Sequence, residues 1–417
     1  MRIFLVSILS FILSATSLLA EDVAPERVPA RVVRPIAERY DDAHRGFQCV
    51  PTLAVTGADR LWAAWYAGGT GEGNDNYVLV ATSADGGATW SEPLFAIDPD
   101  GPVRAFDEIL WTDPNGRLWL FWGQAVFQRS GIVQWEIHCD DPENGADAHW
   151  SEPRALYDGL ILNKPIVDSK GRWLYPVQTP RGAAVYVSED GGETVEYLAT
   201  ASTPPEELAG ADEHCLIEKR DGSLWLYDRL RVPGIGQTYS TDGGKTWSAF
   251  EVNDWNNAVS RFFIRRLRSG ALLLVKHGGL GEYCGRTNLK AFVSEDDGAT
   301  RQGGLLLEPR FRCSYPDGDQ TEDGTIYITY DRNRGLEREL YCARFTEADV
   351  KAGKPVSDVC RLQVLIDKPT DAFQTWWESS CRHTGPDGKP GEYWTTEETI
   401  EAIRQIERGE REPVKNL

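Results

Sequence analysis

The chain alternates short apolar stretches with polar turns that contain Gly. The stretch 118–122 follows Asn115-Gly116, and the stretch 224–227 follows Asp221-Gly222. Short runs rich in aromatic and β-branched residues, each bounded by a tight turn, are typical of β-strands. The same turn-and-strand unit occurs six times, at residues 57–65, 116–122, 171–175, 221–227, 269–275 and 323–330. The pattern therefore predicts an all-β chain built from similar units.

A polar box of the form Ser-x-Asp-x-Gly-x-Thr lies between these strands. It occurs at residues 83–89, 188–194, 240–246 and 294–300. Ser and Asp side chains bond to the backbone of a tight turn, and Gly adopts the left-handed conformation that such a turn requires. A calcium-binding loop is the alternative, but it needs more oxygen ligands and a closing Glu at a fixed spacing. We therefore interpret the boxes as structural turns.

The spacing of the boxes predicts the architecture. The last three boxes start 52 and 54 residues apart, and the first gap of 105 residues is about twice as long. A degenerate copy is therefore expected near residues 138–153, where the sequence Trp-Ser-Glu-Pro of the first box recurs. A period of about fifty residues built from short strands is typical of a β-propeller.

We expect a six-bladed propeller over residues 31–367. The last blade has no recognisable box, and residues 341–345 are predicted to form its third strand. A strand at 31–36 is expected to close the ring by pairing with residues 361–366. Residues 21–30 are expected to form a mobile lead-in.

Residues 1–20 have the pattern of an export signal. A basic start is followed by a mostly apolar run and by Ala20, after which the chain becomes acidic. We predict cleavage after Ala20 and a secreted or periplasmic protein with no membrane span after signal removal; a membrane anchor is the alternative. At the other end, residues 368–417 are predicted to form an extension with one helix at about 396–408, because Ile recurs there at helical spacing.

The composition limits the partners. The formal net charge of −20 disfavours a nucleic-acid backbone as the ligand. Eight Cys are present without a CxxC pair, so neither a metal site nor a cofactor is predicted. Disulfide pairing and buried free thiols both stay open, as does the oligomeric state.

The boxes resemble those of the bacterial sialidases and their relatives, over residues 45–365. This resemblance implies a sialidase-like propeller and a Tyr nucleophile. In that family the Tyr lies eight residues before the Asp-Gly turn of the last blade, which corresponds to Tyr315 before Asp323-Gly324. The Glu that assists it corresponds to Glu213. The alternatives are a blade-core aromatic residue for Tyr315 and an ion-paired carboxylate for Glu213.

The resemblance also implies three arginines that bind a substrate carboxylate. Arg229 and Arg286 match the second and third; a surface ion pair is the alternative for each. The first has no match, because residues 47–51 read Phe-Gln-Cys-Val-Pro where the family has Arg-Ile-Pro. Arg45 is the nearest substitute in sequence.

The family's acid/base Asp corresponds to Glu72, with Asp75 as the fallback on the same Gly-rich loop. The histidines offer a different chemistry. His44, His214 and His277 lie in segments that could face the axis, and His214 is the first choice for a base beside a carboxylate; a hydrogen-bonded structural His is the alternative.

Taken together, the resemblance implies an exo-acting, retaining glycoside hydrolase that removes a terminal acidic sugar from a glycan. Two other hypotheses stay open. One is a lyase or glycosidase that acts on uronic-acid glycans through His and Tyr. The other is a propeller that binds glycans without catalysis, which the missing first arginine suggests.

Overall fold

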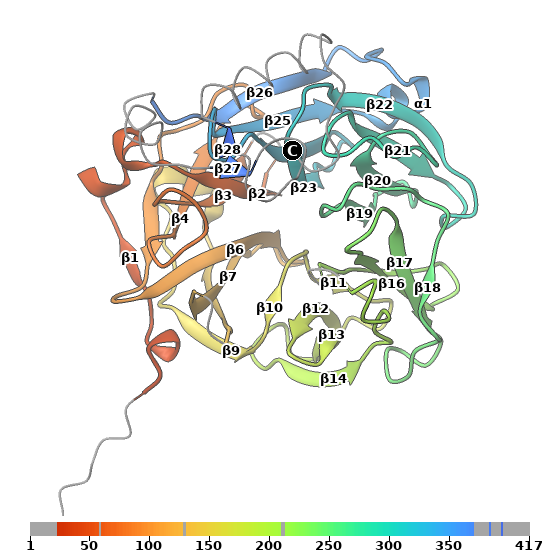
Figure 1. The fold of residues 1–417 in the computed structure, drawn as a ribbon, viewed down its shortest axis with the longest axis horizontal. Coiled ribbons are helices and arrows are strands. Elements are labelled where there is room, and N and C mark those ends of the chain that lie inside the picture. Colours follow the sequence, from red (N-terminus) through yellow and green to blue (C-terminus); the bar gives the residue numbers. More distant parts are fainter. Residues whose placement is uncertain are drawn as a thin grey trace, which may run out of the picture.

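The computed structural model describes residues 23–57, 60–127, 131–209 and 213–370, together with the short strands β27 (His383–Thr384) and β28 (Tyr393–Trp394). Within these residues six antiparallel sheets are arranged as blades around a central axis, as predicted (Figure 1). The predicted signal at 1–20 and the predicted helix at 396–408 lie outside the described residues.

Each blade has four antiparallel strands that follow one another from the axis outward. The first blade consists of β2 (Gln48–Val55), β3 (Leu61–Ala67), β4 (Tyr77–Ser83) and β5 (Phe95–Asp98), and the second of β6 (Val103–Thr112), β7 (Leu118–Val126), β8 (Val133–Cys139) and β9 (Arg154–Asp158). In the third blade the inner strand is divided into β10 (Leu160–Ile161) and β11 (Ile166–Val167), and β12 (Trp173–Thr179), β13 (Gly182–Ser188) and β14 (Glu196–Thr200) follow. The fourth blade consists of β15 (Cys215–Glu218), β16 (Leu224–Arg229), β17 (Ile235–Ser240) and β18 (Glu251–Val252). The fifth consists of β19 (Phe263–Arg266), β20 (Leu272–His277), β21 (Leu289–Ser294) and β22 (Gln302–Glu308). The last consists of β23 (Cys313–Gln320), β24 (Ile326–Arg332), β25 (Glu339–Phe345) and β26 (Arg361–Asp367).

The prediction that strand 31–36 closes the ring is wrong. β1 (Arg31–Val33) pairs with β5 and adds a fifth strand to the outer edge of the first blade. Asp98 of β5 holds it there, since its carboxylate accepts from Arg31 and Arg39. The last blade already has its own fourth strand, because β26 pairs with β25.

Carboxylates of the last blade join it to the first. Backbone N–H groups of β2 donate to Asp317 and Asp319 at 3.0 and 3.1 Å and to Asp331 at 3.0 Å. These bonds fix the inner strand of the first blade against the first two strands of the last blade.

The expectation of a mobile lead-in is also wrong for the described residues from 23 onward. The short 3-10 helix η1 (Pro25–Arg27) lies on the second blade. Gln124 Nε2 donates to the carbonyls of Glu26 and Val28, and Trp135 Nε1 donates to Glu26 O at 3.0 Å. Buried side-chain donors therefore hold this segment.

The boxes have the structural role that the sequence predicted. In one of them Asp242 Oδ1 accepts from Ser240 Oγ and Thr246 N, and Oδ2 accepts from Thr246 Oγ1 at 2.6 Å. Equivalent bonds in two other boxes hold the pKa of Asp190 and of Asp296 at about 2. The Asp carboxylates are thus fully engaged in their own turns.

The degenerate box at 138–153 is confirmed. Cys139 Sγ takes the place of the Ser hydroxyl and donates to Asp141 Oδ1, and His149 replaces the Thr by contacting Asp141 through both its backbone N and its ring Nδ1. In the last blade, which lacks a box, the helix α1 (Glu347–Ala352) follows β25 with a capping box at Thr346 and Asp349.

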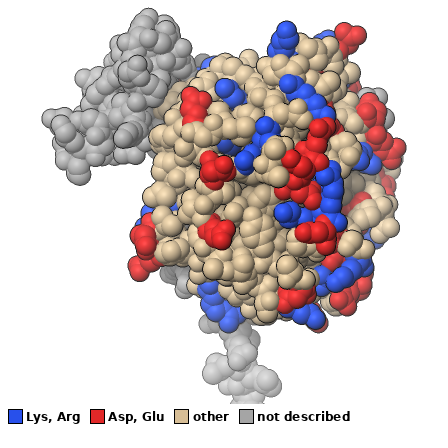
Figure 2. Space-filling model, turned by 90° about the vertical axis from the view of Figure 1, so that its right-hand side faces the viewer, with Lys and Arg blue, Asp and Glu red and all other residues tan. Residues whose placement is uncertain are grey.

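Between the blades, the core is rich in Trp. Trp119 contacts Trp173 of the next blade edge-on, with ring centroids 5.8 Å apart. The described cysteines 49, 139, 215, 284, 313, 342 and 360 are free thiols, most of them buried, and Cys381 lies outside the described residues. On the surface, Figure 2 shows acidic and basic side chains interspersed over the visible face. No helix within the described ranges has the length and apolar character needed to cross a membrane.

Candidate functional site

Four of the predicted site residues reach one mouth of the ring because of blade topology. In an antiparallel blade, the start of the inner strand, the end of the second strand and the connection to the third lie at the same end. Glu213 precedes β15, Arg229 ends β16, Arg286 lies between β20 and β21, and Tyr315 lies near the start of β23. We call this end, defined by these four residues, the tyrosine mouth.

A β-bulge sets the direction of the Tyr315 side chain. The register of β23 shifts between Ser314 and Asp317, and Tyr315 has a φ of 53°. The inner strands β2 and β6 have a bulge at the equivalent place, with Val50 at 54° and Asp107 at 48°. Bulges turn side chains out of the regular alternation, and left-handed non-Gly residues are concentrated at functional sites.

Arg229 connects the phenol of Tyr315 with the carboxylate of Glu213. Its Nη1 donates to Glu213 Oε1 at 2.6 Å and to Tyr315 Oη at 3.2 Å. Burial lowers the pKa of Arg229, but its interactions with Glu213 and Tyr315 raise the pKa by more, so the pKa lies above its ordinary value. Glu213 Oε2 is buried and has no hydrogen-bond partner within the described part of the chain. One oxygen of this carboxylate is therefore free to accept a proton.

Three further guanidinium groups surround the ring of Tyr315. The Arg334, Arg261 and Arg286 guanidinium carbons lie 4.3, 5.2 and 5.6 Å from its centroid. Arg286 donates to Ser314 Oγ at 3.2 Å and to Val259 O at 2.9 Å. The ring of Tyr315 is therefore surrounded by arginine side chains, although the whole chain is acidic.

Glu72 lies across the mouth from Glu213, on the loop between β3 and β4. Its carboxylate oxygens lie 3.9 Å from Arg334 Nη1 and 4.0 Å from Arg104 Nη1, and its side chain is half exposed. Asn76 fixes the loop, since its amide donates to the carbonyls of Gly68 and Gly71. Asp75 is exposed on the same loop.

Arg45 does not reach the cluster around Tyr315. It is fully buried, and its guanidinium donates to Asp42, to Asp367 and to Gln48 Oε1. Its charge is thus balanced by two carboxylates of its own neighbourhood, and we do not carry it forward as a substrate ligand.

The histidines also lie outside this cluster. His214 is buried with its Nε2 3.4 Å from the carbonyl of Ala184, in the neighbouring blade. His277 contacts Cys313 O, and burial lowers the pKa of His277 to about 3. His44 is exposed and bonded to Asp41. None of these contacts presents an imidazole to Tyr315.

Sequence reasoning missed Arg104, Asp107, Arg261, Asp331 and Arg334. Arg261 precedes β19 at the place where Glu213 precedes β15, so comparison of the blades with one another could have found it. Burial raises the pKa of Asp107 to about 7; Glu72 and Glu213 add to the rise, while Arg104 and Arg261 oppose it. Asp107 therefore changes charge near neutral pH.

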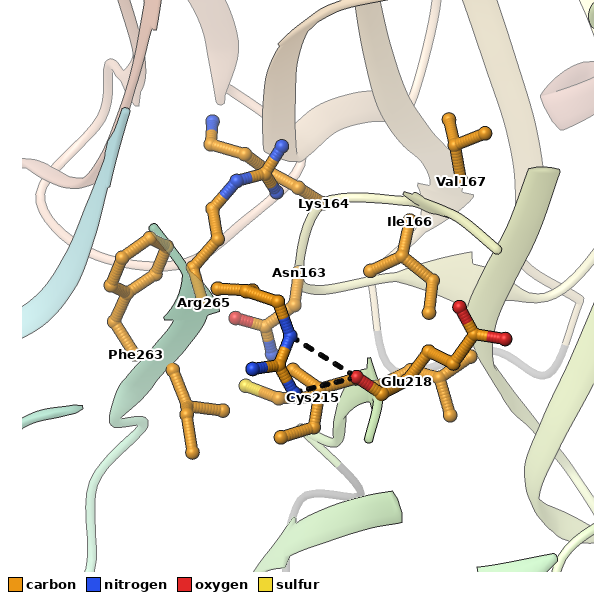
Figure 3. Close-up of a pocket in the computed structure, with 12 residues that line it drawn as sticks. Asn163, Lys164, Ile166, Val167, Cys215, Glu218, Phe263 and Arg265 are labelled. Carbon is orange, nitrogen blue, oxygen red and sulfur yellow. Dashed lines mark hydrogen bonds between the residues drawn. The ribbon is translucent and has the colours of Figure 1, made fainter. Parts of the chain in front are cut away.

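The opposite mouth of the ring carries two cavities away from Tyr315. One of about 930 Å³ is lined by the hairpins that end the inner strands of several blades, and one of about 200 Å³ lies between β11, β15 and β19. Figure 3 shows Lys164 and Arg265 in the smaller cavity. Arg266 also lines this cavity and donates to the backbone carbonyl of Glu218. Lys164 Nζ lies 2.7 Å from Asp317 Oδ2, and both side chains are buried.

Within the described residues, no group of three or more His, Cys, Asp and Glu side chains could hold a metal ion. The groups placed above at the tyrosine mouth are guanidinium groups, carboxylates and the phenol of Tyr315; the phenol of Tyr66 also interacts with Glu72, Asp107 and Arg334.

Comparisons with known proteins agree on the fold. The model of the BNR repeat-like domain matches residues 59–328. A structure of unknown function from Dyadobacter fermentans is 17% identical, with a TM-score of 0.57 over 74% of this chain and 94% of that one. The intramolecular trans-sialidase from Ruminococcus gnavus, solved with oseltamivir carboxylate, is 16% identical, with a TM-score of 0.59 over 77% and 98%. The leech intramolecular trans-sialidase is 16% identical, with a TM-score of 0.58 over 78% and 71%. No curated protein sequence matches the chain.

Proposed function

The chain belongs to the BNR repeat-like domain family, and we propose that it is an exo-acting glycoside hydrolase that cleaves a terminal acidic sugar from glycans with retention of configuration. The observation that carries this proposal is the contact of one guanidinium, Arg229, with both Glu213 and Tyr315. A phenol held beside a carboxylate, in a mouth rich in arginine, is suited to attack on an anionic sugar.

Tyr315 is the proposed nucleophile. Its oxygen forms a bond to the anomeric carbon while the bond to the leaving oxygen breaks. Glu213 accepts the phenolic proton, and Arg229 stabilises the negative charge that develops on the phenol. Glu72 donates a proton to the leaving oxygen. In the second step Glu72 takes a proton from water, which attacks the anomeric carbon, and Tyr315 leaves with the proton that Glu213 returns.

Arg229 and Arg286 are the proposed ligands of the substrate carboxylate. A guanidinium matches a carboxylate with two parallel hydrogen bonds. No carboxylate of the described residues pairs with Arg286, whose hydrogen bonds go to neutral oxygens of Ser314 and Val259. An incoming carboxylate would supply the charge that this arginine lacks. The pattern of residues 1–20 supports a secreted or periplasmic location, where glycans are accessible.

The test is hydrolysis of fluorogenic α-N-acetylneuraminide and β-D-glucuronide by the purified mature protein. We expect release of the fluorophore from an acidic sugar, with the first product formed in the configuration of the substrate by proton NMR. Absorbance from an unsaturated sugar would instead indicate a lyase. Binding of the free sugars without any turnover would identify a non-catalytic glycan-binding propeller.

Binding of a sugar carboxylate is expected to weaken as pH rises through about 7. Above that pH Asp107 is ionised and adds a negative charge to the cationic mouth; below it, Asp107 is neutral. The expected loss of affinity between pH 6 and 8 is about 3- to 10-fold, as for a charge at partly screened distance. Titration calorimetry with N-acetylneuraminic acid would measure it. Asp107→Asn should remove most of the dependence; an unchanged slope in that variant would contradict the assignment.

A further inference from the structure

Two partly buried guanidinium groups at the tyrosine mouth, those of Arg286 and Arg334, lie 5.6 and 4.3 Å from the ring centroid of Tyr315. Burial and the charge of Arg334 both lower the pKa of Arg286. The Arg334 Nη2 atom is buried and lacks a hydrogen-bond partner in the described ranges. Like charges at short distance are unfavourable in a buried site unless an anion joins them. The arrangement therefore suits an anionic ligand.

The turn that carries Arg334 is firmly held. It connects β24 with β25, where Leu336 N and Arg338 N both donate to the carbonyl of Asn333. Arg338 Nη1 donates to Arg45 O, and Gln48 Nε2 donates to Arg338 O at 2.7 Å. Arg45, which the sequence suggested as a ligand, thus helps to fix the position of another arginine.

Asp331 orients the Arg334 side chain from one side. Its Oδ2 lies 3.4 Å from Arg334 Nε and accepts from Val50 N at 3.0 Å. This contact uses the inner edge of the guanidinium. The outer edge, with Nη1 and Nη2, faces Glu72 and the ring of Tyr315.

Arg334 also lies against the segment of the first blade that carries Cys49. Gln48 N donates to Arg334 O, and Arg334 opposes the rise that burial causes in the pKa of the Cys49 thiol. Gln48 or Cys49 stands where the family resemblance implies an arginine. A guanidinium from the last blade therefore lies beside the place where one is missing from the first.

We propose that Arg334 supplies this guanidinium, so that Arg229, Arg286 and Arg334 together bind one carboxylate of the ligand. The assignment rests on the proposed function in its choice of ligand, an acidic sugar. In this arrangement the three arginines, each from a different blade, bind the same ligand carboxylate. A ligand with a neutral group in that place would leave Arg286 without a paired carboxylate, and Arg334 with only Asp331 and the more distant Glu72.

The test is equilibrium binding, which needs no turnover. Titration calorimetry would compare N-acetylneuraminic acid and D-glucuronic acid with their methyl esters. Arg334→Ala should weaken binding of the acid about 10- to 100-fold and leave that of the ester nearly unchanged, as expected for a charge-assisted contact. The affinity of Arg334→Lys for the acid should lie between those of the wild type and of Arg334→Ala. Arg268→Ala, an exposed arginine at the opposite mouth, is the matched control and should bind like the wild type.

A relocated arginine gives a second test. In the variant Cys49→Arg/Arg334→Ala, the guanidinium comes from the first blade into space that Arg334 vacates, and affinity for the acid should recover at least about 10-fold over Arg334→Ala. Should the double variant not fold, the comparison of Arg334→Lys with Arg334→Ala decides alone. Equal binding of the acid by wild type and Arg334→Ala would overturn the role of Arg334 while leaving the proposed function intact. A wild type that binds neither acid would overturn both.

Discussion

Tyr315→Phe is expected to abolish turnover while leaving the fold intact. The substitution removes the oxygen that would bond to the anomeric carbon, and loss of a nucleophile costs about 10³-fold or more in kcat. The side chain keeps its ring, which lies in the core cluster of the first two blades. The thermal unfolding midpoint should therefore stay close to that of the wild type. The measurement is kcat on the fluorogenic acidic glycoside, with affinity for the free acid determined in parallel.

Tyr341→Phe is the matched control for this experiment. Tyr341 lies in the same blade, on β25, and it also has an arginine over its ring and at its hydroxyl, namely Arg310. Its ring and hydroxyl contact Arg310, and its ring stacks on Tyr330; neither residue is assigned to the site, so this variant should keep nearly full activity. Comparable activity in Tyr315→Phe would show that the phenol oxygen has no covalent role.

Asp317→Asn is expected to destabilise the protein by about 3–5 kcal/mol. The substitution keeps an oxygen that can accept from Thr52 Oγ1 and Leu53 N, but it removes the negative charge 2.7 Å from Lys164. Lys164 is almost fully buried and would be left as an uncompensated cation at the centre of the ring. Chemical denaturation at neutral pH, followed by Trp fluorescence, would measure the loss.

The destabilisation caused by Asp317→Asn should depend on pH and on the presence of Lys164. Burial lowers the pKa of Lys164, and loss of Asp317 lowers it further because that carboxylate favours the charged form. The unfolded chain then binds a proton that the folded one does not, and the destabilisation should shrink as pH rises toward the ordinary Lys value of about 10. Lys164→Met combined with Asp317→Asn should recover most of the stability. A double variant as unstable as Asp317→Asn would show that the ion pair is not the cause.

The sequence predicted the features whose causes are local. A box is a turn in which Asp242 bonds to residues at most four positions away, so its role can be derived from the pattern alone. The repeat of turn and strand sets the number of blades for the same reason. The placement of residues 31–33 on the first blade was not predictable in this way, since Asp98 attracts Arg31 only once β5 is in place.

The site shows the same division between local and distant causes. Tyr315, Glu213, Arg229 and Arg286 were assigned from the family resemblance, through their offsets from local motifs. Arg334 has no such motif and reaches the first blade only through the closed ring. Arg45 failed as a substitute because its partner Asp367 lies 322 positions away, which no local pattern indicates.

The most direct test of the proposed mechanism is to trap the covalent intermediate. The wild-type protein would be incubated with a fluorinated analogue of the acidic sugar that carries a good leaving group, digested, and mapped by mass spectrometry. We expect one sugar per chain, attached to the peptide that contains Tyr315, and no label in Tyr315→Phe. Label on Glu72 or Glu213, or turnover of the substrate with no labelled peptide, would contradict Tyr315 as the nucleophile.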